Sequence, residues 1–424
     1  MAKSEVQPIY RCETEVRKPS IFLSHEPGLE TLIAVENSDH WGFDPSLKKD
    51  PRSPELWLED GIREHKEMVS VLRGKGIEIL YLRSLLEGKK HEIKRYILNE
   101  FYRIRNKLAP LDRSVKKAID ASVTAMMDSL VSGVLLGLES GRRFREMKYS
   151  KKREVYCLLE TLMPQTSIYF TQDPVISTPN GLVKAQMAMP IRRQEPDIMQ
   201  IALGKKNYIH ELGSTTEGGD ITMCSSLSYA AGGDVRYVGG TMLFGVSAQS
   251  GKGIEEEIMR ILKKSGVNRL FVFYMPNISD SSLSYAGGNV MHLDTIMMPI
   301  ADGVLLANVN MLKKSRVSEG IGGKLVNGYH WARKNFERVI SVPDREQQGT
   351  YGWGSNVLPL GNMEVLSSTH LRYTNKNLRE AGFDVIAINA ATLTSGFGSF
   401  HCMTAYLMWM QQQNLYSRAL KRQK

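Results

Sequence analysis

Residues 396–404 read Gly-Phe-Gly-Ser-Phe-His-Cys-Met-Thr, which places Cys402 directly after a glycine-punctuated loop. Three upstream segments carry residue types that suit a reactive thiol: Phe-Thr-Gln-Asp-Pro at 170–174, Glu-Gly-Gly-Asp at 217–220 and Met-His-Leu-Asp-Thr at 291–295. A guanidinium group presents five N–H donors in one plane and pairs with carboxylates through parallel hydrogen bonds. The four segments therefore indicate a site that holds a planar cation and attacks its central carbon.

Cys402 is the candidate nucleophile. A thiol reacts as the thiolate and needs an electropositive or hydrogen-bonded setting. The small residues Gly396, Gly398 and Ser399 before it let the backbone approach a ligand closely. The alternative is a buried cysteine that packs as a small hydrophobe. The motifs that accompany Cys402 favour the catalytic interpretation.

His292 and Asp294 are the next candidates. In a strand, alternate residues share a face, so both side chains are expected to point into one site. A histidine titrates near neutral pH and can protonate a leaving amine and then activate water. The alternative is a satisfied core histidine beside a turn carboxylate, and the motif context favours the catalytic role.

Four more polar residues complete the candidate site. Asp173 precedes Pro174 at an expected strand end, where a side chain can face a pocket. Glu217 is suited to orient the histidine or to bind the cation, and Asp220 to brace the glycine turn. Arg192 can clamp a substrate carboxylate, although the start of a surface helix with a charge pair is an equally simple interpretation.

The composition restricts the class of protein. The 424 residues suffice for one large domain or two ordinary ones with a substantial core. No apolar run reaches the roughly 18–20 residues that span a bilayer. The N-terminal sequence Met-Ala-Lys-Ser-Glu-Val lacks the apolar core of a signal peptide. We therefore expect a cytoplasmic protein with no membrane partner.

The formal net charge is +10, and much of the basic excess lies at 89–153 and 418–424. We interpret it as a solvated basic face, because no recognisable nucleic-acid-binding module accompanies it. The four cysteines are too sparse for a disulfide framework and include no CxxC pair. HExxH and the phosphate-binding loop are also missing, so we expect neither a metal site nor a bound nucleotide.

The chain opens as strand, helix and strand, at 21–23, 61–73 and 76–82. Residues 85–162 carry apolar residues at helical spacing, which predicts a helical insertion. Strands return after 164, punctuated by Gly-Gly pairs and by helices at 253–265 and 375–381. The expected later strands are 168–171, 181–189, 235–246 and 270–274. The pattern predicts an α+β fold, and an echo between 226–235 and 282–290 suggests repeated strand-turn modules.

The order of these motifs along nearly the whole chain resembles the arginine deiminases of the guanidine-modifying superfamily. Further segments in the family order are His-Glu-Pro-Gly at 25–28, Glu-His at 64–65 and Arg-Arg-Gln-Glu at 192–195. The resemblance implies a pentein-like five-module α/β propeller formed by residues 1–84 and 163–424. It also implies that residues 85–162 form an inserted helical bundle, and that the protein is a homo-oligomer.

The resemblance further implies the chemistry. Cys402 would be the nucleophile and His292 the general acid and base, with Asp173 and Asp294 as guanidinium clamps. Glu217 would partner the histidine and bind the guanidinium. The implied reaction releases ammonia, passes through a covalent amidino-thioether and gives citrulline from L-arginine, without a cofactor. The implied substrate-binding residues are Arg192, Asp220, Phe397 and Gln249.

The sequence departs from the family pattern at several positions. Gln172 and Phe397 stand where the family usually has arginines, and Gln249 replaces an arginine expected after the Glu-Gly-Gly-Asp region. Ser167, or Gln165, replaces an asparagine. A competing alignment places Ala-Gly-Gly-Asp at 231–234 on the Glu-Gly-Gly-Asp motif and removes the glutamate; we prefer 217–220 because it retains both acids.

These losses affect the groups that would hold an α-carboxylate and spare those that would hold the guanidinium. A lost bidentate arginine costs about a few kcal/mol of recognition. Free arginine is therefore expected to bind weakly, or the substrate is another guanidino compound, for which Phe397 suits an apolar substituent. An amidinotransferase, with an amine in place of water, is the second hypothesis. A non-enzymatic protein that binds a guanidino ligand is the third.

Overall fold

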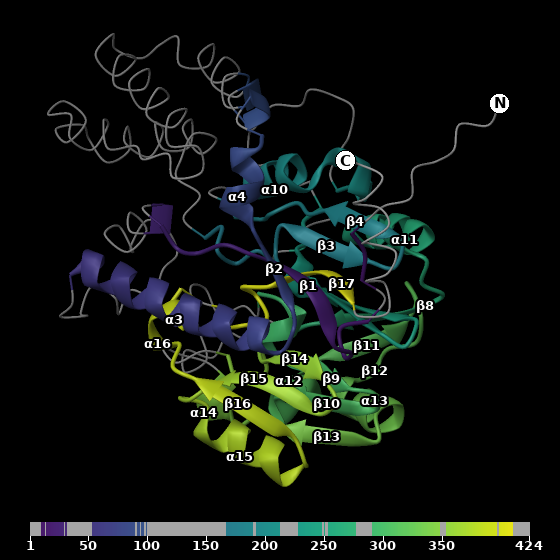
Figure 1. Cartoon of the computed structure of the whole chain (residues 1–424). Helices are drawn as coiled ribbons and strands as arrows, with labels where there is room; N and C mark the ends of the chain where they lie inside the picture. The colour runs from purple at the N-terminus through teal and green to yellow at the C-terminus, as the bar shows by residue number, and fades with distance from the viewer. Residues whose placement is uncertain are drawn as a thin grey trace, which may run out of the picture.

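Five small β-sheets carry the fold in the part of the chain that the structure, a computed structural model, describes. That part comprises residues 10–12, 14–28, 30–31, 53–89, 91–93, 95–96, 99, 167–189, 192–212, 228–247, 250, 253–276, 291–347, 353–396 and 398–409. Figure 1 shows the longest helix, α3 (Pro54–Gly74), and helices α11 (Ile254–Ser265) and α15 (Arg372–Glu380) at the periphery, with strands between them.

Every sheet contains an antiparallel pair of strands and a later strand that runs parallel to the second member. The five units are β3–β4–β5 (Val175–Thr178, Gly181–Lys184, Tyr208–Glu211), β6–β7–β8 (Val235–Val238, Thr241–Val246, Arg269–Tyr274), β9–β10–β13 (Met297–Ala301, Val304–Ala307, Arg338–Ser341), β14–β15–β16 (Leu358–Gly361, Glu364–Ser368, Asp384–Ile388) and β17–β1–β2 (Ala405–Trp409, Pro19–Ser24, Glu78–Tyr81). The second unit is extended by β11 (Arg316–Glu319) and β12 (Val326–Asn327).

Helices make the crossovers between the parallel strands, as this connection requires. Helix α3 joins β1 to β2, α11 joins β7 to β8, and α15 joins β15 to β16. The remaining crossovers contain α10 (Glu195–Leu203), with the 3-10 turn η4 (Lys205–Asn207), and the pair α12 (Val309–Lys314) and α13 (Gly328–Asn335). Shorter helices are α4 (Leu82–Glu87), α14 (Asp344–Gln347) and α16 (Ala391–Thr394), and 3-10 turns η5 (Gly232–Asp234) and η6 (Leu293–Thr295) precede β6 and β9.

The two longest helices follow familiar local rules. Helix α3 begins where Ser53 Oγ accepts the backbone N–H of Leu56 at 3.3 Å, followed by proline in the first turn. Helix α11 has Glu255 to Glu257 in its first turn and Lys263 and Lys264 in its last, which complements the helix dipole. The helix predicted at 253–265 is thus confirmed, and the one at 61–73 begins earlier than its apolar spacing suggests.

The pairing of β1 with β17 brings the two ends of the described chain together. Leu23 lies opposite Ala405, so the loop that carries Cys402 enters the sheet directly beside β1. The largest apolar cluster includes Phe22, Phe170, Cys402 and Tyr406. The candidate nucleophile loop is therefore packed against the main core.

Two local predictions are wrong. The sequence predicts a strand at 168–171, but these residues form a turn in which Phe170 N–H donates to Ser167 O at 3.0 Å. It also predicts that His292 and Asp294 lie on one face of a strand. Instead residues 293–295 form the 3-10 turn η6, and strand β9 begins only at Met297. Ile-Tyr-Phe-Thr at 168–171 consists of residue types common in strands, and Met-His-Leu-Asp at 291–294 alternates apolar and polar residues, so neither segment can be distinguished from a strand by its residues alone.

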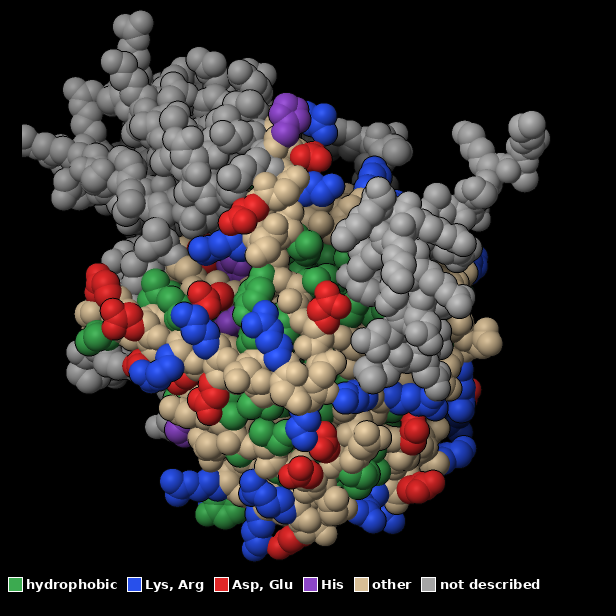
Figure 2. All heavy atoms as spheres, viewed as in Figure 1, with side chains coloured by type: hydrophobic (Ala, Val, Ile, Leu, Met, Phe, Trp, Pro, Cys, Tyr) green, Lys and Arg blue, Asp and Glu red, His purple; other side chains and the backbone are tan. Residues whose placement is uncertain are grey.

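Most of the predicted helical insertion lies outside the described residues, and so do most of the two basic segments. The described positions among residues 91–99 are helical. On the face drawn in Figure 2, acidic and basic side chains are mixed over the described surface. Within the described residues, no helix is long and apolar enough to cross a membrane.

Candidate active site

The loop that carries Cys402 is held by the turn at 170–174. Gln172 N–H donates to Cys402 O at 3.0 Å, and Ala405 N–H donates to Thr171 Oγ1 at 3.2 Å. Glycine is required at 398, because a Cβ there would overlap the ring of Phe170. The glycine-punctuated loop thus allows the close approach that its sequence predicts. Two motifs that are far apart in the sequence are locked together at the nucleophile.

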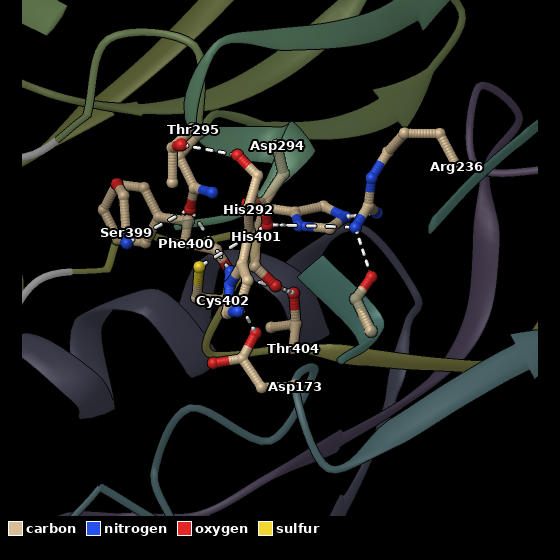
Figure 3. Close-up of polar contacts among 12 residues, drawn as sticks. Asp173, Arg236, His292, Asp294, Thr295, Ser399, Phe400, His401, Cys402 and Thr404 are labelled. Carbon is tan, nitrogen blue, oxygen red and sulfur yellow. Dashed lines mark hydrogen bonds and ion pairs between the residues drawn. The ribbon is translucent and has the colours of Figure 1, made fainter. Parts of the chain in front are cut away.

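Asp173 and Asp294 lie on the two sides of Cys402 (Figure 3). Asp294 Oδ2 is 3.6 Å from Cys402 Sγ, and Asp173 Oδ1 is 3.5 Å from His292 Nδ1. Both carboxylates are almost fully buried. In each of them Oδ1 is buried and has no hydrogen-bond partner among the described residues. The site therefore presents two buried carboxylate oxygens that are available to N–H donors.

Arg192 fixes Asp173. Its Nη1 donates to Asp173 Oδ2 at 2.7 Å, while Nε and Nη2 donate to the carboxylate of Glu195 at 2.8 to 3.1 Å. Nη2 also reaches Phe170 O at 3.4 Å. The alternative interpretation, a surface helix start with a charge pair, is correct in the charge pair with Glu195 at the start of α10 and wrong in its location, because both side chains are buried. Most of the guanidinium's N–H groups are used within the protein, which makes Arg192 a support for the carboxylate in this arrangement.

Asp294 is held by a buried chain of hydrogen bonds. His401 Nδ1–H donates to Asp294 Oδ2 at 2.9 Å, and Arg236 Nη1 donates to His401 Nε2 at 2.7 Å. Arg236 also pairs with Glu15 at 2.8 Å and donates to Gly232 O at 2.5 Å. Burial works to raise the pKa of Asp294, but the hydrogen bond from His401 and the charge of Arg236 hold this pKa at about 2. Asp294 is therefore a carboxylate throughout the neutral range.

His292 lies against the turn η5. A Cβ at Gly233 would come within 2.5 Å of His292 Nδ1, so only glycine permits this approach. The next residue, Asp234, is buried; its Oδ2 accepts the N–H of Ala231 at 3.0 Å, and its Oδ1 has no hydrogen-bond partner among the described residues. The competing assignment of the glycine-glycine-aspartate motif to residues 231–234 thus falls beside the candidate histidine.

The buried charges set the protonation states of the thiol and the imidazole. Burial and the negative charges of Asp294 and Asp173 raise the pKa of the Cys402 thiol well above its ordinary value. Burial works to lower the pKa of His292, but Asp234, Asp173 and Asp294 raise it above its usual range. Burial also raises the pKa of Asp234 to about 7. The buried negative charge of the site thus favours the protonated form of both the thiol and the imidazole.

The structure brings together five of the residues selected from the sequence. These are Cys402, His292, Asp294, Asp173 and Arg192. The other four, Glu217, Asp220, Phe397 and Gln249, lie outside the described residues. Sequence reasoning missed the roles of Glu15, Arg236 and Asn356, for which the chain gives no motif signal. Among the described residues, no group of three or more histidine, cysteine, aspartate or glutamate side chains is placed to hold a metal ion.

A buried thiol, a histidine and two carboxylates that each keep one oxygen free of hydrogen bonds from the described residues are the groups expected of an enzyme that acts on the C–N bonds of a guanidino group. The chain belongs to the arginine deiminase family, whose model, described as arginine deiminase, matches residues 53–408. The arginine deiminase of Borrelia duttonii is 24% identical over 433 residues, which cover 93% of this chain and 97% of that protein. The arginine deiminase of Bacillus cereus is 24% identical over 380 residues, or 81% of this chain and 86% of that protein.

Solved structures share the mixed α/β fold. A dimethylarginine dimethylaminohydrolase adduct with S-methyl-L-thiocitrulline superposes with a TM-score of 0.53 at 14% identity, covering 91% of this chain and 99% of that one. The inosamine-phosphate amidinotransferase of Streptomyces griseus gives a TM-score of 0.52 at 12% identity, covering 95% of this chain and 98% of that one. At these identities the likeness concerns the fold alone.

Proposed function

We propose that this protein hydrolyses the guanidino group of L-arginine or a related guanidino compound, giving citrulline or the corresponding ureido product and ammonia. The observation that carries the proposal is the pair of buried Oδ1 atoms of Asp173 and Asp294 on either side of Cys402, which accept no hydrogen bond from the described residues. A guanidinium ion supplies N–H donors to both oxygens. Its central carbon would then lie next to the sulfur.

Binding of the cation would also activate the thiol. The charges of Asp294 and Asp173 hold the pKa of Cys402 high. A bound guanidinium neutralises both charges, so the pKa of the thiol falls and its proton is released. The thiolate therefore forms when a cationic substrate is present and remains scarce otherwise.

His292 would handle the protons of both halves of the reaction. The thiolate attacks the guanidinium carbon, and the imidazolium of His292 donates a proton to one unsubstituted nitrogen. The C–N bond breaks, ammonia leaves and an amidino-thioether remains on Cys402. The neutral imidazole then takes a proton from water, and the hydroxide adds to the same carbon. The C–S bond breaks, the thiolate returns, and the ureido product forms with loss of the hydroxyl proton to solvent.

Asp234 is the proposed carboxylate partner of His292. It belongs to the turn that contacts the imidazole, and its charge works to raise the pKa of His292. This assignment adopts the alignment at 231–234 and leaves Ala231 where the family motif has glutamate. The predicted role of Glu217 would then pass to Asp234.

The five repeated strand units support a pentein-like five-module propeller as the catalytic domain. Each unit has the same strand order and the same parallel crossover. We assign residues 1–84 and 163–424 to this domain and residues 85–162 to a helical insertion. The ends of β17 and of the turns η5 and η6 then converge on the site.

The decisive experiment measures ammonia and product mass for the purified chain with L-arginine, agmatine and an alkylguanidine. Cys402→Ala is the control and is expected to lower turnover by at least about 10³-fold. Cys402-dependent formation of the ureido product would support the hydrolase. If products formed only when an amine acceptor was added, the protein would be an amidinotransferase and the hydrolase assignment would be wrong. Binding without turnover under either condition would contradict both.

A further inference from the structure

Asn356 holds the nucleophile loop through a single oxygen. It is fully buried in the turn before β14, where its backbone N–H donates to Trp353 O at 2.8 Å. Its Oδ1 accepts the backbone N–H of Ser399 at 3.1 Å and that of Cys402 at 3.3 Å. One amide oxygen therefore fixes the start of the short turn at 399–402 and the nucleophile itself.

The two backbone donors also fix the orientation of the amide. If the amide were flipped, Nδ2 would face two N–H groups, so Oδ1 must point toward the loop. Nδ2 is then left free of both backbone groups; it is buried and has no hydrogen-bond partner among the described residues. Leaving a buried polar group without a hydrogen bond destabilises the folded protein. Because Asn356 contacts the candidate nucleophile, we infer that its Nδ2 has a hydrogen-bond acceptor that forms during the reaction.

The thiolate of Cys402 is such a partner. Its sulfur is 3.6 Å from Asp294 Oδ2, which opposes the negative charge that forms on the sulfur. The backbone N–H of Ser399 and the side chain of Asn356 are the groups that work to lower the pKa of the thiol against burial and the carboxylates. Hydrogen-bond donors placed where charge develops are an effective means of stabilising it.

We propose that Asn356 positions Cys402: its Oδ1 anchors the nucleophile loop, and its Nδ2 donates a hydrogen bond to the thiolate of Cys402. The inference rests on the proposed role of Cys402 as nucleophile. It adds a residue for which neither the motifs nor the deviations of this sequence provide a signal. It also explains how a thiolate can exist beside two carboxylates.

The test measures the rate at which iodoacetamide alkylates Cys402 as a function of pH, with the modified peptide quantified by mass. Two variants separate the loss of the donor from a change of charge. Asn356→Leu removes the amide without adding charge, and Asn356→Asp keeps an acceptor but removes the donor. We expect the midpoint of the profile to rise by about one pH unit or more in both, which is about tenfold slower alkylation below the midpoint.

The matched control is Asn375→Asp in α15. Asn375 is also buried; its Oδ1 accepts from Ser367 Oγ at 2.6 Å and its Nδ2 donates to Ser368 O at 2.8 Å. This variant should lower the melting temperature without moving the alkylation midpoint. An unchanged midpoint in Asn356→Leu, or an equal shift in the control, would overturn the proposal. Alkylation requires no turnover, so a failure of the hydrolase assignment would appear separately in the product assay.

Discussion

His401 and Asp294 form a buried hydrogen bond of 2.9 Å in which the imidazole Nδ1–H donates to Oδ2 of the carboxylate. Arg236 donates to the opposite nitrogen, so the imidazole is held in one tautomer. Asp294 Oδ2 is thereby occupied, and Oδ1 is the oxygen that remains for a ligand. The histidine before the nucleophile thus acts on the carboxylate rather than on the thiol.

This relationship predicts a specific acid dependence of stability. Asp294 has a pKa of about 2 in the folded chain, below its ordinary value near 4. A depressed carboxylate pKa contributes stability that is present above the unfolded pKa and is lost as the pH falls through the folded one. In the wild type the free energy of unfolding should fall by about 2 kcal/mol through Asp294 as the pH decreases from roughly 4 to roughly 2, and we expect Asp294→Asn to lack this fall. Urea unfolding at a series of pH values measures it.

Asp384→Asn provides the control for that series, because Asp384 is exposed at the start of β16. Its unfolding curve should follow the wild type at every pH. If Asp294→Asn kept the same acid slope as the wild type, the buried chain through His401 would not be the origin of the depressed pKa.

Arg192→Lys tests whether Arg192 supports Asp173 or contacts a substrate carboxylate. Lysine cannot reproduce the paired hydrogen bonds to Glu195 and the bond to Asp173 together. We expect kcat/KM to fall by about 10–100-fold for L-arginine and to the same extent for agmatine, which has no carboxylate. Steady-state kinetics with both compounds measures the ratio. A loss confined to L-arginine would instead support the role implied by the family resemblance.

The sequence identifies the reacting residues because their motifs are short and each carries its own chemistry. Cys402 lies 3.6 Å from Asp294 and His292 lies 3.5 Å from Asp173, and all four belong to one site (Figure 3). The local conformation is less predictable. Residues 168–171, Ile-Tyr-Phe-Thr, are all common in strands, and Met-His-Leu-Asp at 291–294 alternates apolar and polar residues, yet 168–171 and 293–295 form turns. The packing of these turns against other segments determines their conformation, and the hydrophobic periodicity of one sequence does not reveal that packing.

The supporting residues could not be predicted for a different reason. Arg236 occupies the second position of a strand, where a basic residue normally faces solvent, yet its side chain is fully buried between Glu15 and His401. Asn356 belongs to a segment without any catalytic pattern. Both acquire their roles from contacts between segments that lie far apart in the sequence. Only the tertiary arrangement reveals such partners.

Asp234→Asn and Glu217→Gln distinguish the two alignments of the glycine-glycine-aspartate motif. Negative charge at Asp234 works to raise the pKa of His292. Its removal lowers that pKa, so the imidazolium is lost at lower pH and the alkaline limb of the kcat/KM profile should move to lower pH. We expect a loss of about 10–100-fold near pH 8 for Asp234→Asn. Glu217→Gln should leave the profile in place.

The reverse result, a shifted profile for Glu217→Gln and none for Asp234→Asn, would restore the assignment to residues 217–220. A measurement of the free energy of unfolding separates a loss of activity caused by misfolding of Asp234→Asn from one caused by the changed pKa of His292. Because burial raises the pKa of Asp234 to about 7 from an ordinary value near 4, the stability of the wild type falls as the pH rises from about 4 to about 7 and changes no further above that. The variant lacks this loss and should therefore gain stability relative to the wild type over the same range.

Gly233→Ala tests the close approach of η5 to the imidazole. The added methyl group would lie 2.5 Å from Nδ1 and 2.8 Å from Cβ of His292, so the ring must move. A displaced general acid no longer reaches the leaving nitrogen, and a misplacement of about 1 Å can cost roughly 10²-fold in rate. We expect kcat to fall by that order while KM changes little. Gly74→Ala at the end of α3, where a methyl group meets no atom within 4 Å, is the matched control and should retain full activity. Equal kcat values for Gly233→Ala and the wild type would show that His292 does not act from its observed position.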